Sequence, residues 1–300
     1  MSGSDRDADP AVEDFRLDKA AVRRRFDRAA TGYETHAILQ RRIEQECLER
    51  LEQIALTPDA VLDIGCGPGF STQRLLRLYP KARVFGLDIA LAMLRRHPRA
   101  GRWRRGARLV CADMEQLPLA PGSVDLVFSS LALQWSDDLD RVFREVFRVL
   151  RPGGCLLFST FGPETLKELR AAWAEADAKP HVSAFADLQD IGDGLARVGF
   201  RDPVMDREVY TLTYADLKGV LDDIRHIGAA NALRNRPRGL TAPKRWRSMV
   251  RAYEAFREGG ALPATYEVNF GVAWRKAGEV HQVGAGGEAP VQWLTRPGRR

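Results

Sequence analysis

Residues 61–70 read VLDIGCGPGF, and this stretch decides the fold. Val61 and Leu62 belong to a short apolar run, and Gly65, Gly67 and Gly69 follow it. The next residues, STQRLLRLY, carry leucines at helical spacing. A strand, a glycine turn and a helix in this order let a ligand lie against bare backbone at a helix N-terminus. Several cofactors use this arrangement, so the stretch predicts a ligand site without identifying the ligand.

Apolar runs alternate with amphipathic segments from residue 60 onward. The helical segment DLDRVFREVFRVL has apolar residues three and four apart, and Pro152-Gly153-Gly154 ends it. Continuously apolar strands separated by helices indicate a parallel sheet covered on both faces. The sequence therefore predicts a doubly wound, seven-stranded, mostly parallel α/β sheet with its ligand beyond the carboxyl ends of the strands. The first five strands are expected at 60–64, 83–87, 108–112, 124–129 and 155–160.

The last third of the chain predicts an antiparallel end to the sheet. A strand is expected at 204–212, and TYEVNFGVAW alternates apolar and polar residues as an antiparallel strand does. Between them, TYADLKGVLDDIRHIG predicts a helix that opens with a capping box from Thr213 to Asp216. We therefore expect a helical insertion before the last strand.

Length and composition predict one ordinary globular domain. The 300 residues are 45% apolar and 29% charged, and no apolar run is long enough to span a membrane. We expect disordered ends at 1–16 and 278–300 and one domain over 17–277. Its parts are N-terminal helices (17–57), a cofactor-binding core (58–162) and a substrate side (163–277). Four scattered cysteines and the polar N-terminus predict a cytoplasmic protein without a metal site.

The glycine loop does not match the two common phosphate-binding patterns. A dinucleotide fingerprint that starts at Gly65 requires glycine at position 70, where Phe70 stands, and no Gly-Lys-Ser/Thr ending follows. Asp63 precedes the glycines, and a carboxylate aimed into the loop would repel a phosphate. It would attract a ligand that bears an ammonium and a sulfonium group.

S-adenosylmethionine is such a ligand, because it joins an adenosine without phosphates to a cationic amino acid. Asp88 closes the second strand, where a carboxylate accepts hydrogen bonds from ribose hydroxyls. Asp113 follows the third strand and can accept from the adenine amino group, with Met114 packing on the ring. An acid at one strand end is often only a turn or helix cap. Three acids in order with the glycines favour S-adenosylmethionine as the cofactor.

The segments DIGCGPG, GLDIA, CADMEQLP, DLVFSSLALQW and LRPGG, in this order, resemble the motifs of class I S-adenosylmethionine-dependent methyltransferases. The resemblance covers roughly residues 60–160. It implies a seven-stranded sheet whose last pair is antiparallel. The residues assigned to the cofactor are Asp63, Gly65, Cys66, Gly67, Gly69, Asp88, Ile89, Asp113, Met114 and Leu131.

A narrower resemblance covers nearly the whole chain. RRFDRAATGYETHAILQ, SSLALQWSDD, FSTFGPETLKELRAAW and TLTYADLKGVLDDIRHIGAANALRNRPRGLT are similar to the family of malonyl-[acyl-carrier protein] O-methyltransferases of biotin synthesis. The resemblance implies that the chain methylates the free carboxylate of a malonyl thioester on an acyl-carrier protein. A carboxylate with a pKa of about 4 is already ionised at neutral pH, so no general base is required and none is assigned.

The residues that orient the acceptor are predicted from their place in these motifs. Gln134 and Trp135 follow the fourth strand, where the family places the acceptor. Tyr33 and His36 lie in the N-terminal segment, which in such folds can close over the cofactor. A positive group in the extra helices is expected to pair with the malonyl carboxylate. The candidates for this pairing are His181, Arg225 and His226. A packing or surface role stays open for each of these residues.

The net charge of +6 is concentrated in two basic runs, 95–108 and 225–251. Such runs are either a solvated face or a surface for an acidic partner. Acyl-carrier proteins are acidic, so the resemblance gives both runs a candidate partner, with 225–251 as the first choice of docking surface and 95–108 as the second. The expected docking residues are Arg234, Arg236, Arg238, Lys244, Arg245 and Arg247.

Other functions stay open at this point. The basic balance also suits RNA, although the chain shows no appended nucleic-acid module and no motif for methylating a base amine, so nucleic acid is not the expected partner. A small carboxylic acid in solution is another possible acceptor. Mitochondrial relatives resemble complex I assembly factors that hydroxylate an arginine, which makes a protein-modifying role a further alternative. The sequence leaves the oligomeric state and the choice between carrier protein and coenzyme A open.

Overall fold

The structure, a computed structural model, describes residues 17–98, 106–226, 231, 233 and 241–276. Its centre is a seven-stranded sheet with the strand order β3-β2-β1-β4-β5-β7-β6. Strands β1 to β5 pair in parallel, and β7 lies antiparallel between β5 and β6. This confirms the predicted fold class. The strands are β1 Ala60–Ile64, β2 Arg83–Asp88, β3 Arg108–Cys111, β4 Val124–Ser130, β5 Leu150–Phe161, β6 Phe200–Tyr214 and β7 Leu262–Arg275.

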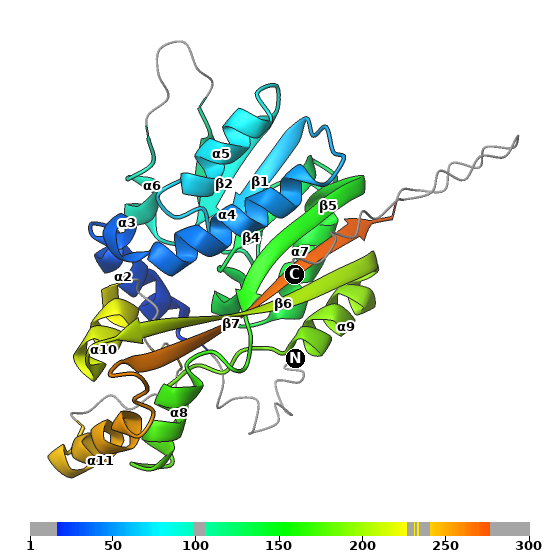
Figure 1. The fold of residues 1–300 in the computed structure, drawn as a ribbon. Helices are drawn as coiled ribbons and strands as arrows, with labels where there is room; N and C mark the ends of the chain where they lie inside the picture. Colours follow the sequence, from blue (N-terminus) through cyan, green and yellow to red (C-terminus); the bar gives the residue numbers. More distant parts are fainter. Residues whose placement is uncertain (1–16, 99–105, 227–230, 232, 234–240, 277–300) are drawn as a thin grey trace, which may run out of the picture.

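Helices cover both faces of the sheet (Figure 1). Helices α4 and α5 lie on one face, and α7 and α9 lie on the other. No helix within the described ranges is long and apolar enough to cross a membrane. The helices are α2 Lys19–Ala29, α3 Tyr33–His36, α4 Ile38–Glu52, α5 Phe70–Leu78, α6 Leu91–Leu94, α7 Leu139–Val149, α8 Lys167–Ala174, α9 Leu188–Val198, α10 Leu217–His226 and α11 Pro243–Glu254, with a 3-10 turn at Leu133–Trp135.

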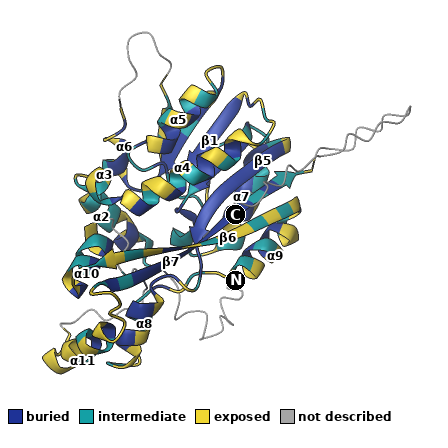
Figure 2. Ribbon diagram, in the orientation of Figure 1, coloured by how far each residue is buried: buried dark blue, intermediate teal, exposed yellow. Residues whose placement is uncertain are grey.

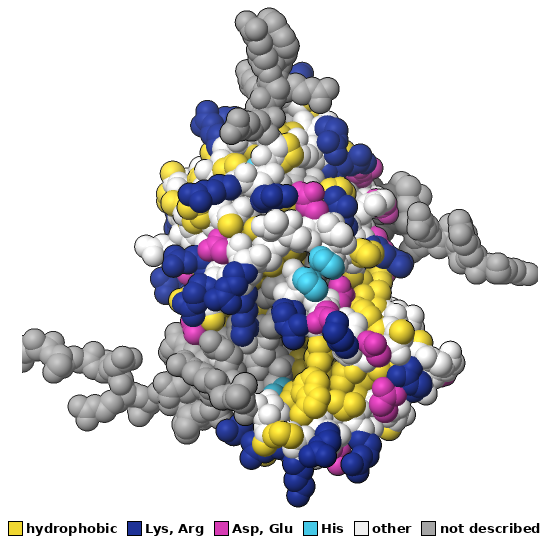
Figure 3. Space-filling model, turned by 90° about the vertical axis from the view of Figure 1, so that its left-hand side faces the viewer, with side chains coloured by type: hydrophobic (Ala, Val, Ile, Leu, Met, Phe, Trp, Pro, Cys, Tyr) yellow, Lys and Arg dark blue, Asp and Glu magenta, His cyan; other side chains and the backbone are white. Residues whose placement is uncertain are grey.

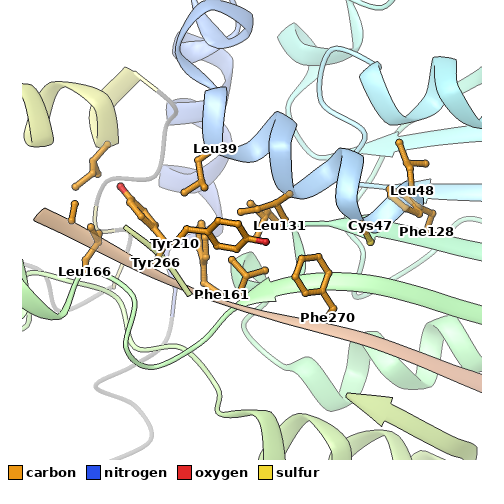
Figure 4. Close-up of a cluster of buried hydrophobic side chains, with 14 of the residues drawn as sticks. Leu39, Cys47, Leu48, Phe128, Leu131, Phe161, Leu166, Tyr210, Tyr266 and Phe270 are labelled. Carbon is orange, nitrogen blue, oxygen red and sulfur yellow. The ribbon is translucent and has the colours of Figure 1, made fainter. Parts of the chain in front are cut away.

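The central strands β1, β4, β5 and β7 are mostly buried because each face of the sheet has its own apolar core, as the dark blue strands of Figure 2 show. Successive side chains of a strand point to opposite faces. In β1, Val61 therefore joins the core under α4, whereas Leu62 joins the core under α7. Figure 4 shows the first core, in which Leu39 of α4 lies above Leu131 and Phe161 at the carboxyl ends of β4 and β5. Burial of each such side chain contributes about 1.5–3 kcal/mol to folding.

Helix α4 buries an apolar stripe against the sheet. Leu39, Ile43, Cys47 and Leu51 of α4 are at most 5% exposed and pack on the sheet. Ala37, with a ψ angle of 46°, separates the short helix α3 from α4. This break turns α3 toward the carboxyl ends of the strands, where the cofactor site was expected.

The insertion between β6 and β7 holds α10 and α11, as expected, but the predicted capping box is wrong. Thr213 belongs to β6 and pairs with Pro263 in the ladder with β7, so it does not begin the helix. Asp216 caps α10 instead, because its carboxylate accepts the N–H of Gly219 at 2.8 Å. The ladder hydrogen bonds with β7 extend β6 to Tyr214, beyond the expected end.

Candidate active site

The glycine loop between β1 and α5 is shaped by close contacts. The backbone N–H groups of Gly65 and Cys66 both donate to the carbonyl of Leu87, at 2.7 and 3.0 Å. Gly65 has a φ of 70°, and a Cβ there would lie 2.2 Å from the Cβ of Ala132. Gly69 has a φ of 100°, and a Cβ there would lie 2.3 Å from the His97 ring. Both positions therefore require glycine.

Two adjoining cavities open beside this loop. The inner cavity, of about 70 Å³, lies under α2 and includes the predicted residues Asp88, Ile89, Asp113, Met114 and Trp135 in its lining. The outer cavity, of about 290 Å³, lies under α3 and α4 and includes Cys66 and Gly69. Five residues line both cavities, so the two spaces are neighbours. These shared residues are Tyr33, Gly65, Gly67, Ser130 and Leu131.

Asp88 is the most enclosed acid of the inner cavity. It is 9% exposed, and it accepts the N–H groups of Gly67 at 2.9 Å and of Ala90 at 2.7 Å. Burial raises the pKa of Asp88 to about 6, although these backbone hydrogen bonds oppose the shift. The carboxylate is therefore ionised at neutral pH, and it lines the cavity as an acceptor for hydroxyl groups.

Asp113 is held by the helix that covers the inner cavity. The ammonium of Lys19, in the first turn of α2, lies 2.7 Å from the carboxylates of both Asp113 and Glu115. Asp113 also accepts the N–H of Glu115 at 2.9 Å. The sequence pattern did not indicate Lys19, because its partner lies 94 residues away. These ion pairs fasten α2 over the site.

Asp63 does not face either cavity, which differs from the expectation that its carboxylate is aimed at the ligand. It is 1% exposed and accepts the hydroxyl hydrogens of Ser71 at 2.7 Å and Thr72 at 2.5 Å. Burial raises the pKa of Asp63 to about 6. Its visible role is to join the end of β1 to the first turn of α5 and so to shape the loop.

An acid that the sequence analysis missed lines the outer cavity. Glu44 of α4 accepts the N–H of Ser71 at 2.8 Å, and burial raises its pKa to about 7, with a smaller contribution from Asp63. Arg41 lines the same cavity one turn earlier, with its guanidinium over the Phe70 ring. The sequence signal that could have indicated Glu44 is the position of an acid next to Ile43 in the apolar stripe of α4. The outer cavity thus combines a carboxylate and a guanidinium, a pair that suits an amino acid.

Two of the residues predicted to orient the acceptor line the inner cavity. Trp135 and Tyr33 line the inner cavity, and Trp135 packs edge-on against Phe26 of α2 at 5.4 Å. Gln134 does not line it, because its amide donates to the carbonyl of Leu131 at 2.7 Å and accepts from Thr160 at 3.2 Å.

The other acceptor candidates lie outside both cavities. His36 and His226 stack on each other with ring centroids 4.1 Å apart, which joins α3 to α10. Arg225 is exposed and paired with Asp222 at 2.6 Å. His181 stacks on Trp173 at 3.7 Å, in a separate groove.

Three of the six docking candidates lie in α11. Lys244, Arg245 and Arg247 are exposed there, and Arg245 lies 3.6 Å from Asp177. Arg234, Arg236 and Arg238 lie outside the described residues.

The site fits S-adenosylmethionine better than it fits a phosphate-bearing nucleotide. Asp88 and Asp113 line the inner cavity beside apolar groups that suit adenosine, including Ile89 and Met114. The outer cavity offers Glu44 to an ammonium and Arg41 to a carboxylate. A pyrophosphate beside these acids would meet like charge, whereas a sulfonium and an ammonium meet opposite charge.

The fold and this site define a class of protein, the S-adenosylmethionine-dependent methyltransferases. A family model described as "Methyltransferase domain" matches residues 62–158. The chain belongs to the malonyl-[acyl-carrier protein] O-methyltransferase family, because relatives of that name match it along most of its length. The protein of Gallionella capsiferriformans is 48% identical over 280 residues, which cover 91% of this chain and 97% of that protein. The protein of a Methylovorus species is 48% identical over 290 residues, which cover 94% of this chain and 97% of that protein.

Solved structures agree with the fold. The YcgJ protein of Bacillus subtilis matches with a TM-score of 0.55 at 15% identity, over 78% of this chain and all of that one. An S-adenosylmethionine-dependent methyltransferase of Thermotoga maritima matches with a TM-score of 0.50 at 16% identity, over 84% of this chain and 99% of that one. The names of the sequence relatives favour a carboxyl methyltransferase over the assembly-factor and RNA alternatives.

We expect cofactor binding to weaken as the pH falls below neutral. The pKa values of Asp88, about 6, and Glu44, about 7, are raised by burial, so both acids bind protons between pH 7 and pH 5. A protonated acid loses its attraction for ribose hydroxyls or an ammonium. The dissociation constant of S-adenosylhomocysteine should therefore rise by up to about tenfold per pH unit and per acid below each pKa.

Calorimetry from pH 5 to pH 8 measures this dependence, and buffers of different ionisation enthalpy count the released protons. Glu44→Gln is the matched control, because it should remove the part of the dependence near pH 7 and leave the part near pH 6. A constant affinity over this range would contradict the assignment of both acids.

Proposed function

We propose that this chain transfers a methyl group from S-adenosylmethionine to the free carboxylate of a malonyl thioester on an acyl-carrier protein, early in biotin synthesis. The observation that carries the proposal is the 48% identity to proteins of that name over 97% of their length. The site adds support, because acids line its two cavities and a neutral aromatic wall stands beside them.

The reaction needs positioning more than proton transfer. The malonyl carboxylate is ionised at neutral pH, so its oxygen can attack the methyl carbon directly. S-adenosylmethionine supplies an electrophilic methyl group on a sulfonium. One oxygen–carbon bond forms while one carbon–sulfur bond breaks, the electron pair goes to sulfur, and no proton moves. The negative and positive charges cancel, so exclusion of water favours the transfer.

The chain's own residues provide the positioning. We assign Asp88 to the ribose hydroxyls, Asp113 to the adenine amino group, and Glu44 with Arg41 to the amino-acid end. Trp135 and Phe26 close the inner cavity from the side of α2 and exclude water. Burial raises the pKa of Tyr33 far above its usual value, so its phenol stays protonated and can donate to an acceptor carboxylate.

The proposed partner is an acidic carrier protein, and α11 is its proposed docking surface. Lys244, Arg245 and Arg247 lie on this helix, and Lys and Arg side chains gather at the lower end of the face shown in Figure 3, at the height of α11 in Figure 1. Opposite charges across such a surface steer association and are screened by salt. Binding of the carrier should therefore weaken as the salt concentration rises.

An acceptor comparison tests the function. The protein is incubated with labelled S-adenosylmethionine and, in parallel, with malonyl-carrier protein, free malonate, RNA or complex I peptides. We expect label only on the malonyl carrier, as a base-labile methyl ester, with turnover that falls from low to high salt. Label on RNA or on peptides, or none on the malonyl carrier, would overturn the proposal.

A further inference from the structure

A groove of about 570 Å³ beside α8 is not used by the chemistry described above. It lies where the chain leaves β5 and passes through α8 toward α9, on the predicted substrate side. The side chains that give the groove its character are Arg170, Trp173, Asp177, Lys179, His181 and Phe185.

One wall of the groove is flat and aromatic. The His181 ring stacks on Trp173 with centroids 3.7 Å apart and planes within 7° of parallel. The Asp177 carboxylate forms a hydrogen bond with Nε2 of His181 at 2.8 Å, which fixes the orientation of the ring. Phe185 continues the wall and packs on Phe161, the last residue of β5, at 5.7 Å. Such a wall suits an extended chain that carries amide and methyl groups.

The charge of the groove favours an anion. Arg170 is fixed there, because its guanidinium donates to the carbonyls of Pro163 at 2.7 Å and Thr165 at 3.0 Å. Lys179 is exposed, and its ammonium has no hydrogen bond or ion pair among the described residues.

The one acid among the described residues of the lining is already engaged. Burial by itself would raise the pKa of Asp177, but the N–H of Lys179, the His181 ring and Arg245 together lower it. Asp177 therefore offers little repulsion to an anionic ligand.

Two chains of contacts link the groove to the wall of the inner cavity. On one side Phe161 follows Thr160, whose hydroxyl donates to Gln134, and Gln134 in turn holds the Leu131 carbonyl of the cavity wall. On the other side the Asn231 amide donates to the Pro180 carbonyl at 2.8 Å. The Asn231 carbonyl accepts from Arg25 of α2, the helix that covers the inner cavity. The end of β5 and α2 thus join the walls of the two spaces.

We infer that this groove binds the phosphopantetheine arm that carries the malonyl group, with the phosphodiester toward Lys179 and Arg170 and the amides along the Trp173–His181 wall. The inference rests on the proposed function, since it requires a malonyl thioester as substrate. The arm has an anionic phosphodiester, two geminal methyl groups, two amides and a thioester, in this order. These groups match the cationic end and the aromatic wall of the groove, and the inner cavity, whose wall is linked to the groove, would take the malonyl end. Coenzyme A carries the same arm, so it forms one branch of the test.

The test uses Lys179→Glu, an exposed substitution, and three malonyl thioesters: of the carrier protein, of coenzyme A and of N-acetylcysteamine. The N-acetylcysteamine thioester contains a single amide and lacks the phosphodiester. We expect KM to rise by roughly tenfold for the first two at unchanged kcat, and to stay constant for the third. Lys167→Glu is the matched control, because Lys167 is an exposed lysine of α8 outside the groove. It should leave all three KM values unchanged.

A rise in KM for the N-acetylcysteamine thioester, or an equal rise with Lys167→Glu, would overturn the inference. A rise with only one of the two pantetheine substrates would also overturn it, because Lys179 would then contact the carrier surface or the nucleotide and not the shared arm. Unchanged KM values for all three thioesters with Lys179→Glu would also overturn the inference. Failure of the proposed function looks different, because the unsubstituted protein would then methylate none of the three thioesters.

Discussion

Asp88→Ala is expected to weaken the binding of S-adenosylhomocysteine by about 100-fold. Asp88 is an enclosed carboxylate that lines the inner cavity and is ionised at neutral pH. Two hydroxyl hydrogen bonds to a charged acceptor are together worth about 3 kcal/mol, which corresponds to this factor. The substitution also frees the N–H groups of Gly67 and Ala90, which loosens the loop.

Calorimetry with two ligands separates these two effects. An analogue of S-adenosylhomocysteine without the two ribose hydroxyls should bind the original protein weakly and Asp88→Ala with nearly the same affinity. An equal loss for both ligands would mean that Asp88 acts only through the shape of the loop. A loss of less than about threefold for S-adenosylhomocysteine would contradict the assignment itself.

Gly65→Ala is expected to have the second large effect, on stability and cofactor binding together. A Cβ at this position would lie 2.2 Å from the Cβ of Ala132, and the φ of 70° is strained for alanine. Strain of about 1–2 kcal/mol and overpacking of about 1–3 kcal/mol should lower the free energy of unfolding by roughly 3 kcal/mol. Because Gly65 and Ala132 line the inner cavity, any shift that relieves the clash changes the site.

Urea unfolding and calorimetry measure this effect, and Gly67→Ala is the matched control. Gly67 also has a positive φ, of 51°, but a Cβ there would meet no atom within 4 Å. It should lose only about 1 kcal/mol of stability, from the backbone strain. The double variant Gly65→Ala with Ala132→Gly should regain part of the loss. Equal losses for the two glycine variants, or no recovery in the double variant, would show that the close contact is not the cause.

The sheet and most of the inner cavity were predictable because they depend on local patterns. Apolar runs at β1, β2 and β4 and the helical period of α7 gave the alternation of a doubly wound sheet. The carboxyl ends of parallel strands lie at one edge, so the acid that ends β2 and the acid after β3 were expected to meet. Asp88 and Asp113 indeed line one cavity, as do Met114 and Leu131.

The remaining features depend on contacts between distant segments. Lys19 reaches Asp113 only because α2 folds across the edge of the sheet, and Glu44 reaches the glycine loop only because α4 packs beside α5. Asp63 was placed correctly at the end of β1, but the hydroxyls of α5 turn its carboxylate away from the cavities. Likewise, His181 stacks on Trp173 outside the cofactor site. No local pattern specifies which of several partners such a side chain finds.

The central claim is that these two cavities hold a cationic nucleoside without phosphates. A crystal structure with S-adenosylhomocysteine tests it most directly. We expect the ribose hydroxyls on Asp88, the adenine beside Asp113 and Met114, and the amino-acid end in the outer cavity between Arg41 and Glu44. Cavities without the ligand, or a pyrophosphate against the glycine loop, would contradict the claim.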